Sequence, residues 1–182
     1  ENKHSYASPM MYDHDGLKFL VTHGADFIIA HDLKDGHEIW RCGDLNVKSK
    51  YDKTLRFVAS PLCADGMIVV PTAKAGPVRV LRPDGKGDIT LNKEAHIWSY
   101  ATTPDVPSPL IHDGLVYLCM ANGNLSCLDQ KTGEEYYAER THRQRHRSSP
   151  VYADGHLYLT ARDGIISVVK TGKKFELVAQ NE

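Results

Sequence analysis

Short apolar segments alternate with turn residues along the whole chain. Four six-residue runs are rich in aliphatic, β-branched and aromatic side chains, and each of them follows an Asp-Gly pair. Runs this short, bounded by turn signals, are typical of β-strands rather than of buried helices. The four runs are LKFLVT (17–22), MIVVPT (67–72), LVYLCM (115–120) and HLYLTA (156–161).

A second apolar segment follows each run after a turn. Glycine is frequent in these turns because it adopts positive φ without a steric penalty, as tight hairpins require. The turns contain Gly24, Ala75-Gly76, Gly123 and Gly164, and the segments after them are DFIIAHD (26–32), PVRVLRP (77–83), NLSCLDQ (124–130) and IISVVKT (165–171). A third turn closes each segment, at Asp35-Gly36, Asp84-Gly85, Thr132-Gly133 and Thr171-Gly172. The pattern predicts a unit of four short antiparallel strands.

Ser-Pro dipeptides mark the start of each unit. They begin at residues 8, 60, 108 and 149, with spacings of 52, 48 and 41 residues. A proline is tolerated at the first residue of a strand, where its missing N–H costs no ladder bond. Repeats of this length with four strands indicate propeller blades rather than a helical solenoid. We therefore predict an all-β fold, one propeller region over residues 1–182, with blades at about 8–52, 60–100, 108–141 and 149–182.

Two segments carry a family motif. AHDLKDGHEIW (30–40) and CLDQKTGEEYY (127–137) resemble the AxDxxTGxxxW motif of pyrroloquinoline-quinone-type propeller repeats. The matching residues are Ala30, Asp32, Gly36 and Trp40 in the first segment, and Asp129, Thr132, Gly133 and Tyr137 in the second. The resemblance implies that the aspartate and glycine shape a turn and that the aromatic residue packs between blades, as Trp98 would in the second unit. It also implies a wheel of seven or eight blades, of which four are present.

Proteins of this family have different functions. Quinoprotein alcohol and sugar dehydrogenases bind the quinone and Ca²⁺ over the propeller axis, whereas the outer-membrane assembly lipoprotein of Gram-negative bacteria uses the fold as a scaffold. This chain has no vicinal Cys-Cys, and no carboxylate–amide calcium set is readable in it. We therefore expect a non-catalytic scaffold that binds a protein or ligand on one face, without a cofactor. The alternatives are part of a quinone- and calcium-dependent dehydrogenase, and a carbohydrate-binding propeller.

The resemblance also bears on location and partners. It implies a periplasmic or extracellular protein, and we expect no signal peptide within this chain. The expected partner is another protein or the missing part of the propeller. A second copy of the chain could supply that part, in which case the protein would be a homo-oligomer.

The composition argues against several classes of function. Of 182 residues, 41% are hydrophobic and 25% are charged, and the formal net charge is −1. A chain so near neutrality has no global field that would attract nucleic acid or an anionic membrane. The apolar runs are too short to span a bilayer. The four cysteines show no metal-ligand spacing and are predicted to be buried thiols.

One segment, ERTHRQRHRSSP (139–150), is strongly basic. It joins the fourth strand of the third unit to the first strand of the fourth unit. In a propeller this junction lies on the same face as the turns between second and third strands. Guanidinium groups bind carboxylates and phosphates in bidentate geometry. The candidate residues for binding an anion or a partner are Arg143, Arg145, His146 and Arg147.

The same segment also allows a plainer interpretation, because charge runs are often solvated loops. Its positive charge would then be balanced by nearby acids such as Glu134, Glu135 and Glu139. If the segment does bind an anion, its histidines would add positive charge below about pH 6.5. No residue set in the sequence is predicted to be catalytic or to bind a metal.

Overall fold

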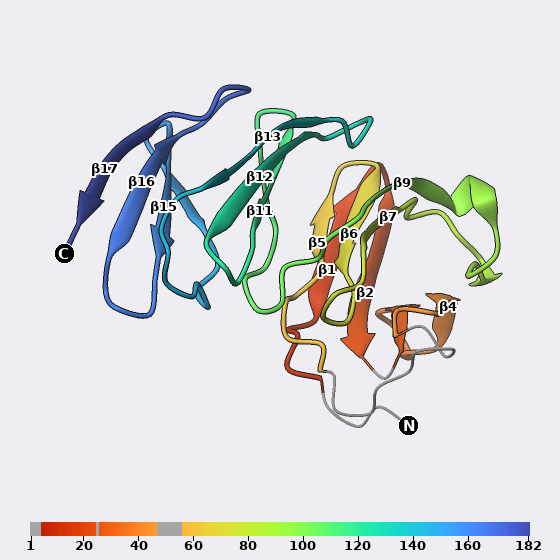
Figure 1. Ribbon diagram of the computed structural model, residues 1–182. Coiled ribbons are helices and arrows are strands. Elements are labelled where there is room, and N and C mark those ends of the chain that lie inside the picture. Colours follow the sequence, from red (N-terminus) through yellow and green to blue (C-terminus); the bar gives the residue numbers. More distant parts are fainter. Residues whose placement is uncertain (1–4, 25, 47–55) are drawn as a thin grey trace. The chain divides into compact units, whose positions relative to one another are not determined.

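The computed structural model describes residues 5–24, 26–46 and 56–182. Within these ranges the regular elements are β-strands and one short 3₁₀ helix, Lys93–Ala95. The strands form four sheets that follow one another along the chain, as Figure 1 shows. The prediction of an all-β fold with four blades of four-stranded type is therefore confirmed. The blades fall into two compact units, Glu1–Thr103 and Pro104–Glu182.

Each unit contains two blades. In unit 1, blade 1 consists of β1 (Met10–His14), β2 (Leu17–Gly24), β3 (Phe27–His31) and β4 (Glu38–Cys42), and blade 2 consists of β5 (Leu62–Ala64), β6 (Met67–Pro71), β7 (Val78–Leu81) and β9 (His96–Tyr100). In unit 2, blade 3 consists of β10 (Leu110–His112), β11 (Leu115–Cys119), β12 (Asn124–Asp129) and β13 (Glu135–Arg140), and blade 4 consists of β14 (Val151–Ala153), β15 (His156–Thr160), β16 (Ile166–Lys170) and β17 (Leu177–Asn181).

The Asp-Gly pairs form the first hairpin of each blade. In three of the four pairs, both residues have positive φ, with aspartate at 46–49° and glycine at 71–76°. Two consecutive positive φ values define the turn whose twist matches that of antiparallel strands. The second hairpins turn at the predicted glycines, between β2 and β3, β6 and β7, β11 and β12, and β15 and β16. The turn chemistry thus accounts for the meander of each blade.

Blade 2 departs from the regular meander. The connection between β7 and β9 leaves the blade and adds a short strand, β8 (Gly87–Asp88), in parallel to β4 of blade 1. Ile89 is fully buried there, and its N–H donates to the carbonyl O of Arg41 at 2.8 Å. The hydroxyl of Thr90 accepts from the N–H of Gly43 at 2.7 Å. The insertion therefore covers the outer edge of blade 1, which would otherwise present unpaired backbone groups.

Aromatic side chains join the two blades of unit 1. Trp40 on β4 is fully buried, and its indole Nε1 donates to the carbonyl O of Pro83 at 3.0 Å. Phe19 meets Trp40 edge-on and stacks on Tyr12, whose hydroxyl accepts from the N–H of Gly66 at 3.1 Å. Pro83 and Gly66 both belong to blade 2. The indole and phenol groups of blade 1 therefore bury apolar area and satisfy backbone groups of its neighbour.

Unit 2 uses the same device with tyrosines. The ring of Tyr137 on β13 is buried and meets Phe175 edge-on, with 5.5 Å between ring centroids. The hydroxyl of the buried Tyr117 accepts a hydrogen bond from the N–H of Gly172 at 2.9 Å. Phe175 and Gly172 lie in the β16–β17 turn of blade 4. Tyrosines of blade 3 thus contact the turn of the next blade through both ring and hydroxyl.

These aromatic residues share one place in the strand register. The pairing register of third and fourth strand shifts at one position in every blade. Trp40, Trp98 and Tyr137 are the fourth-strand residues paired directly before that shift, and Trp98 is half-buried. In blade 4 the equivalent residue is Ala179. Blade 4 therefore lacks the large aromatic side chain that the other blades carry here.

The cysteines lie in the blade cores. Cys42, Cys119 and Cys127 are buried and Cys63 is partly buried, all as thiols. Burial raises the pKa of Cys63 and of Cys119 to about 12. Cys119 pairs with Leu125 across the hairpin, and Cys127 pairs with Tyr117. These groups are therefore un-ionised packing residues at neutral pH.

Candidate functional site

The basic segment 139–150, called the arginine segment below, lies in unit 2. Its first two residues end β13, and the rest forms the connection to β14. Two turns hold it: the β11–β12 turn of blade 3 (residues 120–123) and the β15–β16 turn of blade 4 (residues 161–165). The site is thus built from three separate parts of the sequence.

The β11–β12 turn holds the segment through its backbone. The N–H and the hydroxyl of Thr141 both donate to the carbonyl O of Gly123, each at 2.9 Å. The N–H of His146 donates to the carbonyl O of Ala121 at 3.1 Å. Two points five residues apart are therefore bonded to one turn, which fixes the course of the chain between them.

Gly123 allows this close approach. Its φ is +90°, and a Cβ built on it would lie 2.0 Å from the carbonyl O of His142. Only a residue without a side chain fits both the backbone conformation and the space. The arginine segment therefore packs directly against the Asn122-Gly123 turn.

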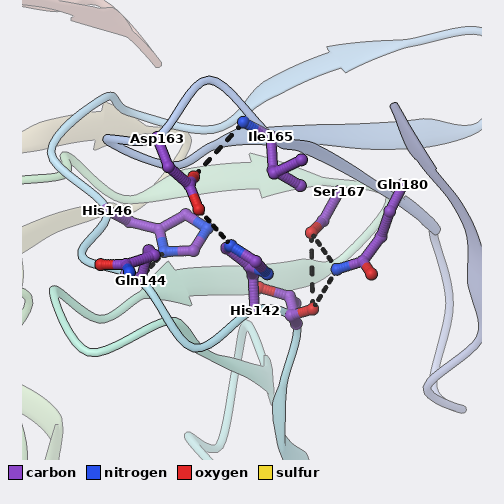
Figure 2. A network of polar contacts seen from close by, with 8 residues as sticks. His142, Gln144, His146, Asp163, Ile165, Ser167 and Gln180 are labelled. Carbon is purple, nitrogen blue, oxygen red and sulfur yellow. Dashed lines mark hydrogen bonds and ion pairs between the residues drawn. The ribbon is translucent and has the colours of Figure 1, made fainter. Parts of the chain in front are cut away.

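The β15–β16 turn holds the segment from blade 4. His146 and Ala161 form an antiparallel β-bridge, and the N–H of Arg162 donates to the carbonyl O of Arg145 at 2.9 Å. Nε2 of His142 lies 2.8 Å from Oδ2 of Asp163, as Figure 2 shows. This contact lowers the pKa of Asp163 below its ordinary value, chiefly through the hydrogen bond to His142. Asp163 is therefore a carboxylate over the whole neutral range.

The start of the segment is bonded to strands β16 and β17. Nε2 of Gln180 donates to the carbonyl O of Thr141 at 2.8 Å and to the hydroxyl of Ser167 at 3.2 Å. The Ser167 hydroxyl itself lies 3.5 Å from the same carbonyl. Figure 2 shows these bonds beside the His142–Asp163 pair. The network joins blade 3 to blade 4 by side chains as well as by backbone.

His146 lies inside the site rather than on its surface. The residue is fully buried, and Nδ1 faces the carbonyl O of Gln144 at 3.1 Å. Nε2 has no hydrogen-bond partner in the part of the chain that the structure describes. Burial lowers the pKa of His146 below its ordinary value. The expectation that this imidazole gains charge below about pH 6.5 is therefore wrong for His146, because its neutral form persists to lower pH.

The arginines are presented outward. Arg143, Arg145 and Arg147 are exposed, as is Arg162 of the neighbouring turn. Within residues 5–24, 26–46 and 56–182, none of these four guanidinium groups is in an ion pair. The acid that reaches the arginine segment is Asp163, and its contact is to His142. A shallow pocket on this surface is lined by Gln144, Arg145, Arg162 and Asp163.

Arg162 and Asp163 are site residues that the sequence pattern did not indicate. Both lie in the turn around Gly164, which the repeat pattern had located as the second hairpin of the fourth unit. That turn is expected on the same face of the propeller as the connection that precedes its blade. Its polar residues were therefore the sequence feature that could have indicated this part of the site. The bonding of Arg162 to Arg145 depends on how two loops meet, and no local pattern reports it.

The motif residues hold turns at the third hairpin. Oδ1 of Asp129 accepts from the N–H groups of Lys131 and Thr132 at 2.9 and 3.0 Å, and Gly133 has φ of +74°. Asp32 accepts from the N–H of Lys34 at 2.7 Å in blade 1. These aspartates cap their turns by side-chain acceptance of backbone N–H groups. These hydrogen bonds give the motif aspartates a structural role in their turns, as the resemblance implied.

Comparison with known proteins gives the same repeat type. Residues 85–174 match the family described as outer membrane protein assembly factor BamB. No curated protein matches the sequence. In the described ranges, no helix is long and apolar enough to cross a membrane.

Three solved structures illustrate the fold. BamB from Moraxella catarrhalis superposes with a TM-score of 0.66 at 20% identity, over 91% of this chain and 46% of that one. The quinohemoprotein alcohol dehydrogenase ADHIIG from Pseudomonas putida HK5 superposes with a TM-score of 0.70 at 15% identity, over 100% and 34%. Sqt1 from Saccharomyces cerevisiae superposes with 0.72 at 12% identity, over 94% and 47%. The chain thus spans about half the length of BamB, and these likenesses concern the fold.

Proposed function

We propose that this chain, whose repeats are of the pyrroloquinoline-quinone type, is a non-catalytic propeller scaffold that binds an acidic protein partner through the arginine segment. The fold is shared by a protein named as an assembly factor and by a dehydrogenase, so the fold alone does not choose between binding and catalysis. The site supports the choice of binding.

The observation that carries the proposal is a set of exposed arginines on a firmly held loop. The guanidinium groups of Arg143, Arg145 and Arg147 have no acidic partner among the residues that the structure describes. The backbone beneath them is bonded to turns of two blades. A preformed loop loses little conformational entropy on binding, so the charge-assisted hydrogen bonds to a carboxylate are retained as affinity.

The proposal includes no quinone and no calcium. A calcium ion takes six to eight oxygen ligands. In the described chain, one group of three acidic or imidazole side chains comes close enough to share an ion: Asp32, Asp35 and His37. That group lies in the β3–β4 turn, where Asp32 and Asp35 already accept backbone N–H groups. Its donors form the turn itself and do not fit a quinone–calcium centre.

We also propose a cellular location and a partner for the protein. By family likeness we place the protein in the periplasm or outside the cell. Its partner is either another protein or the further blades of the propeller, from a second copy of the chain or from a further segment.

Titration with poly-glutamate tests the binding proposal. We expect the wild-type chain to bind a short poly-glutamate at low salt and to bind it more weakly as salt rises. The triple variant Arg143→Gln, Arg145→Gln, Arg147→Gln should lose about tenfold or more in affinity, because hydrogen bonds to charged groups contribute about 1.5–3 kcal/mol each. Isothermal calorimetry or fluorescence anisotropy measures the change.

A charge-matched variant controls for net charge. Lys34→Gln, Lys86→Gln, Lys93→Gln removes three exposed positive charges from unit 1, outside the arginine segment, and should leave the affinity within about twofold, since salt screens exposed charges that do not contact the ligand. Equal losses in both triple variants would show that only net charge matters and would refute the proposal. Stoichiometric binding of added quinone and Ca²⁺ with dye-linked oxidation of an alcohol would establish the dehydrogenase instead.

A further inference from the structure

The geometry points to a phosphate subsite in the pocket between Arg145 and Arg162, and we infer that it receives a dianionic phosphate group. This inference rests on the proposed function and names the chemistry that the arginine segment recognises. Arg162 contributes to it from blade 4, outside the segment. The group that binds is either free phosphate or a phosphorylated side chain of the partner.

The first observation is the backbone relationship of the two arginines. The bridge between His146 and Ala161 and the hydrogen bond from the N–H of Arg162 to the carbonyl O of Arg145 place the two residues as neighbours across paired chains. Both residues line the same pocket. Like charges at neighbouring cross-strand positions destabilise the pairing. A bound anion would offset the repulsion between the two guanidinium groups. This explains why two arginines occur at these paired positions.

The second observation is that the nearby acid is already engaged. Asp163 also lines the pocket, but its Oδ2 contacts Nε2 of His142 at 2.8 Å. Its Oδ1 accepts from the N–H of Ile165 at 3.4 Å. Neither oxygen forms an ion pair with Arg145 or Arg162 in the described structure. The carboxylate therefore leaves both guanidinium forks available to a ligand.

The third observation is the charge and shape of the pocket. One guanidinium satisfies one carboxylate through two parallel hydrogen bonds. The two guanidinium groups carry +2 and the Asp163 carboxylate carries −1, so the pocket keeps a net positive charge toward a phosphate monoester, which carries about −1.5 to −2 at neutral pH and offers three acceptor oxygens to the two forks. The side-chain amide of Gln144, which lines the pocket as well, adds a neutral donor. The pocket thus favours phosphate over a carboxylate.

The support beneath the pocket is rigid. His146, between Gln144 and Arg147, is fully buried and bonded to Ala121 and Ala161. The carbonyl O of His142 also lies directly against Gly123 of blade 3. Arg145 is therefore held on a fixed backbone opposite Arg162, and the two forks need only side-chain ordering to close on a ligand.

Titration with three probes tests the subsite. The probes are inorganic phosphate, a short peptide with one phosphoserine, and the same peptide without phosphate; acetate is the carboxylate control. We expect Arg145→Gln and Arg162→Gln each to weaken phosphate binding by about tenfold, because each removes a bidentate contact. Lys174→Gln, which removes an exposed positive charge of unit 2 outside both the arginine segment and the pocket lining, should change it by less than about twofold.

Replacement by lysine separates geometry from charge. Arg162→Lys keeps the positive charge but loses the planar fork, so it should recover only part of the affinity. A phosphopeptide that binds more tightly than inorganic phosphate identifies a phosphorylated partner, and the reverse identifies free phosphate. Circular dichroism and thermal unfolding confirm that each variant is folded.

The inference is overturned if neither phosphate probe binds, if acetate binds as tightly as phosphate, or if Lys174→Gln weakens binding as much as Arg162→Gln. The two proposals fail separately. Loss of the subsite alone would leave poly-glutamate binding sensitive to the triple arginine variant, whereas failure of the scaffold proposal would make poly-glutamate binding insensitive to it.

Discussion

The hydroxyl of Ser149 accepts a hydrogen bond from the backbone N–H of Ser108 at 2.9 Å. Both serines precede the proline of a Ser-Pro dipeptide, one at the start of blade 3 and one at the start of blade 4. The same bond joins Ser60 to the N–H of Ser8 in unit 1, also at 2.9 Å. The serine of the repeat thus ties the entrance of its own blade to that of the blade before it.

Removing this hydroxyl should destabilise one unit selectively. Ser149→Ala should lower the free energy of unfolding by about 0.5–1.5 kcal/mol, the usual net value of one hydrogen bond, since the N–H of Ser108 loses its partner. Ser148→Ala, one residue earlier and exposed, is the matched control and should change it by less than about 0.5 kcal/mol. Urea unfolding measures both. Equal effects of the two substitutions would show that water replaces the lost hydroxyl as the partner of the Ser108 N–H.

The inter-blade aromatic residues should carry much more stability. Trp40→Ala and Tyr137→Ala should each cost about 3–5 kcal/mol, because each leaves a large cavity in a packed core. Leu91→Ala, at a side chain that is 87% exposed, should cost less than about 0.5 kcal/mol. Thermal unfolding compares the three. A small shift for Trp40→Ala would mean that its indole contributes little to docking blade 1 on blade 2.

Gly123 should be sensitive to a single methyl group. Gly123→Ala places a Cβ 2.0 Å from the carbonyl O of His142 and forces alanine into positive φ, so it should displace the arginine segment and weaken poly-glutamate binding. Gly114→Ala has φ of +71° with open space around it and should cost only the backbone strain of about 1–2 kcal/mol. Calorimetry of binding separates the two variants. Unchanged binding by Gly123→Ala would show that the segment accommodates the methyl group.

Unit 1 should lose stability in mild acid because of His23. Burial lowers the pKa of His23 to about 4, below the ordinary value of about 6.5. Above pH 6.5 the imidazole of His23 is neutral in both the folded and the unfolded chain. As the pH falls from 6.5 toward 4, it binds a proton in the unfolded chain but stays neutral in the folded chain. Stability should therefore fall over that window, by roughly 3 kcal/mol in total.

His23→Phe tests the origin of this pH dependence. The ring of His23 already packs edge-on against Phe57, so an apolar ring suits the site. The variant should unfold with a flatter dependence on pH between 6.5 and 4.5 than the wild-type chain. Parallel curves for the two proteins would assign the acid sensitivity to other groups.

Much of the blade structure follows from local sequence. In three of the four Asp-Gly pairs both residues adopt the positive φ that a tight hairpin requires, and short β-rich segments between such turns have few alternatives to hairpins. The spacing of the Ser-Pro dipeptides therefore sufficed to place four meanders and their turns. The motif aspartates were equally readable, because Asp129 bonds to N–H groups two and three residues further on.

The sequence by itself determined the strands of each meander and their turns, because each depends on residues within about ten positions of one another. Only the tertiary structure decided that Gly87 and Asp88 pair with β4, that His146 is buried, and that Arg162 faces Arg145. Each of these is a meeting of separate segments, whose register is set by the packing of one blade on the next. Local propensity carries no information about that packing.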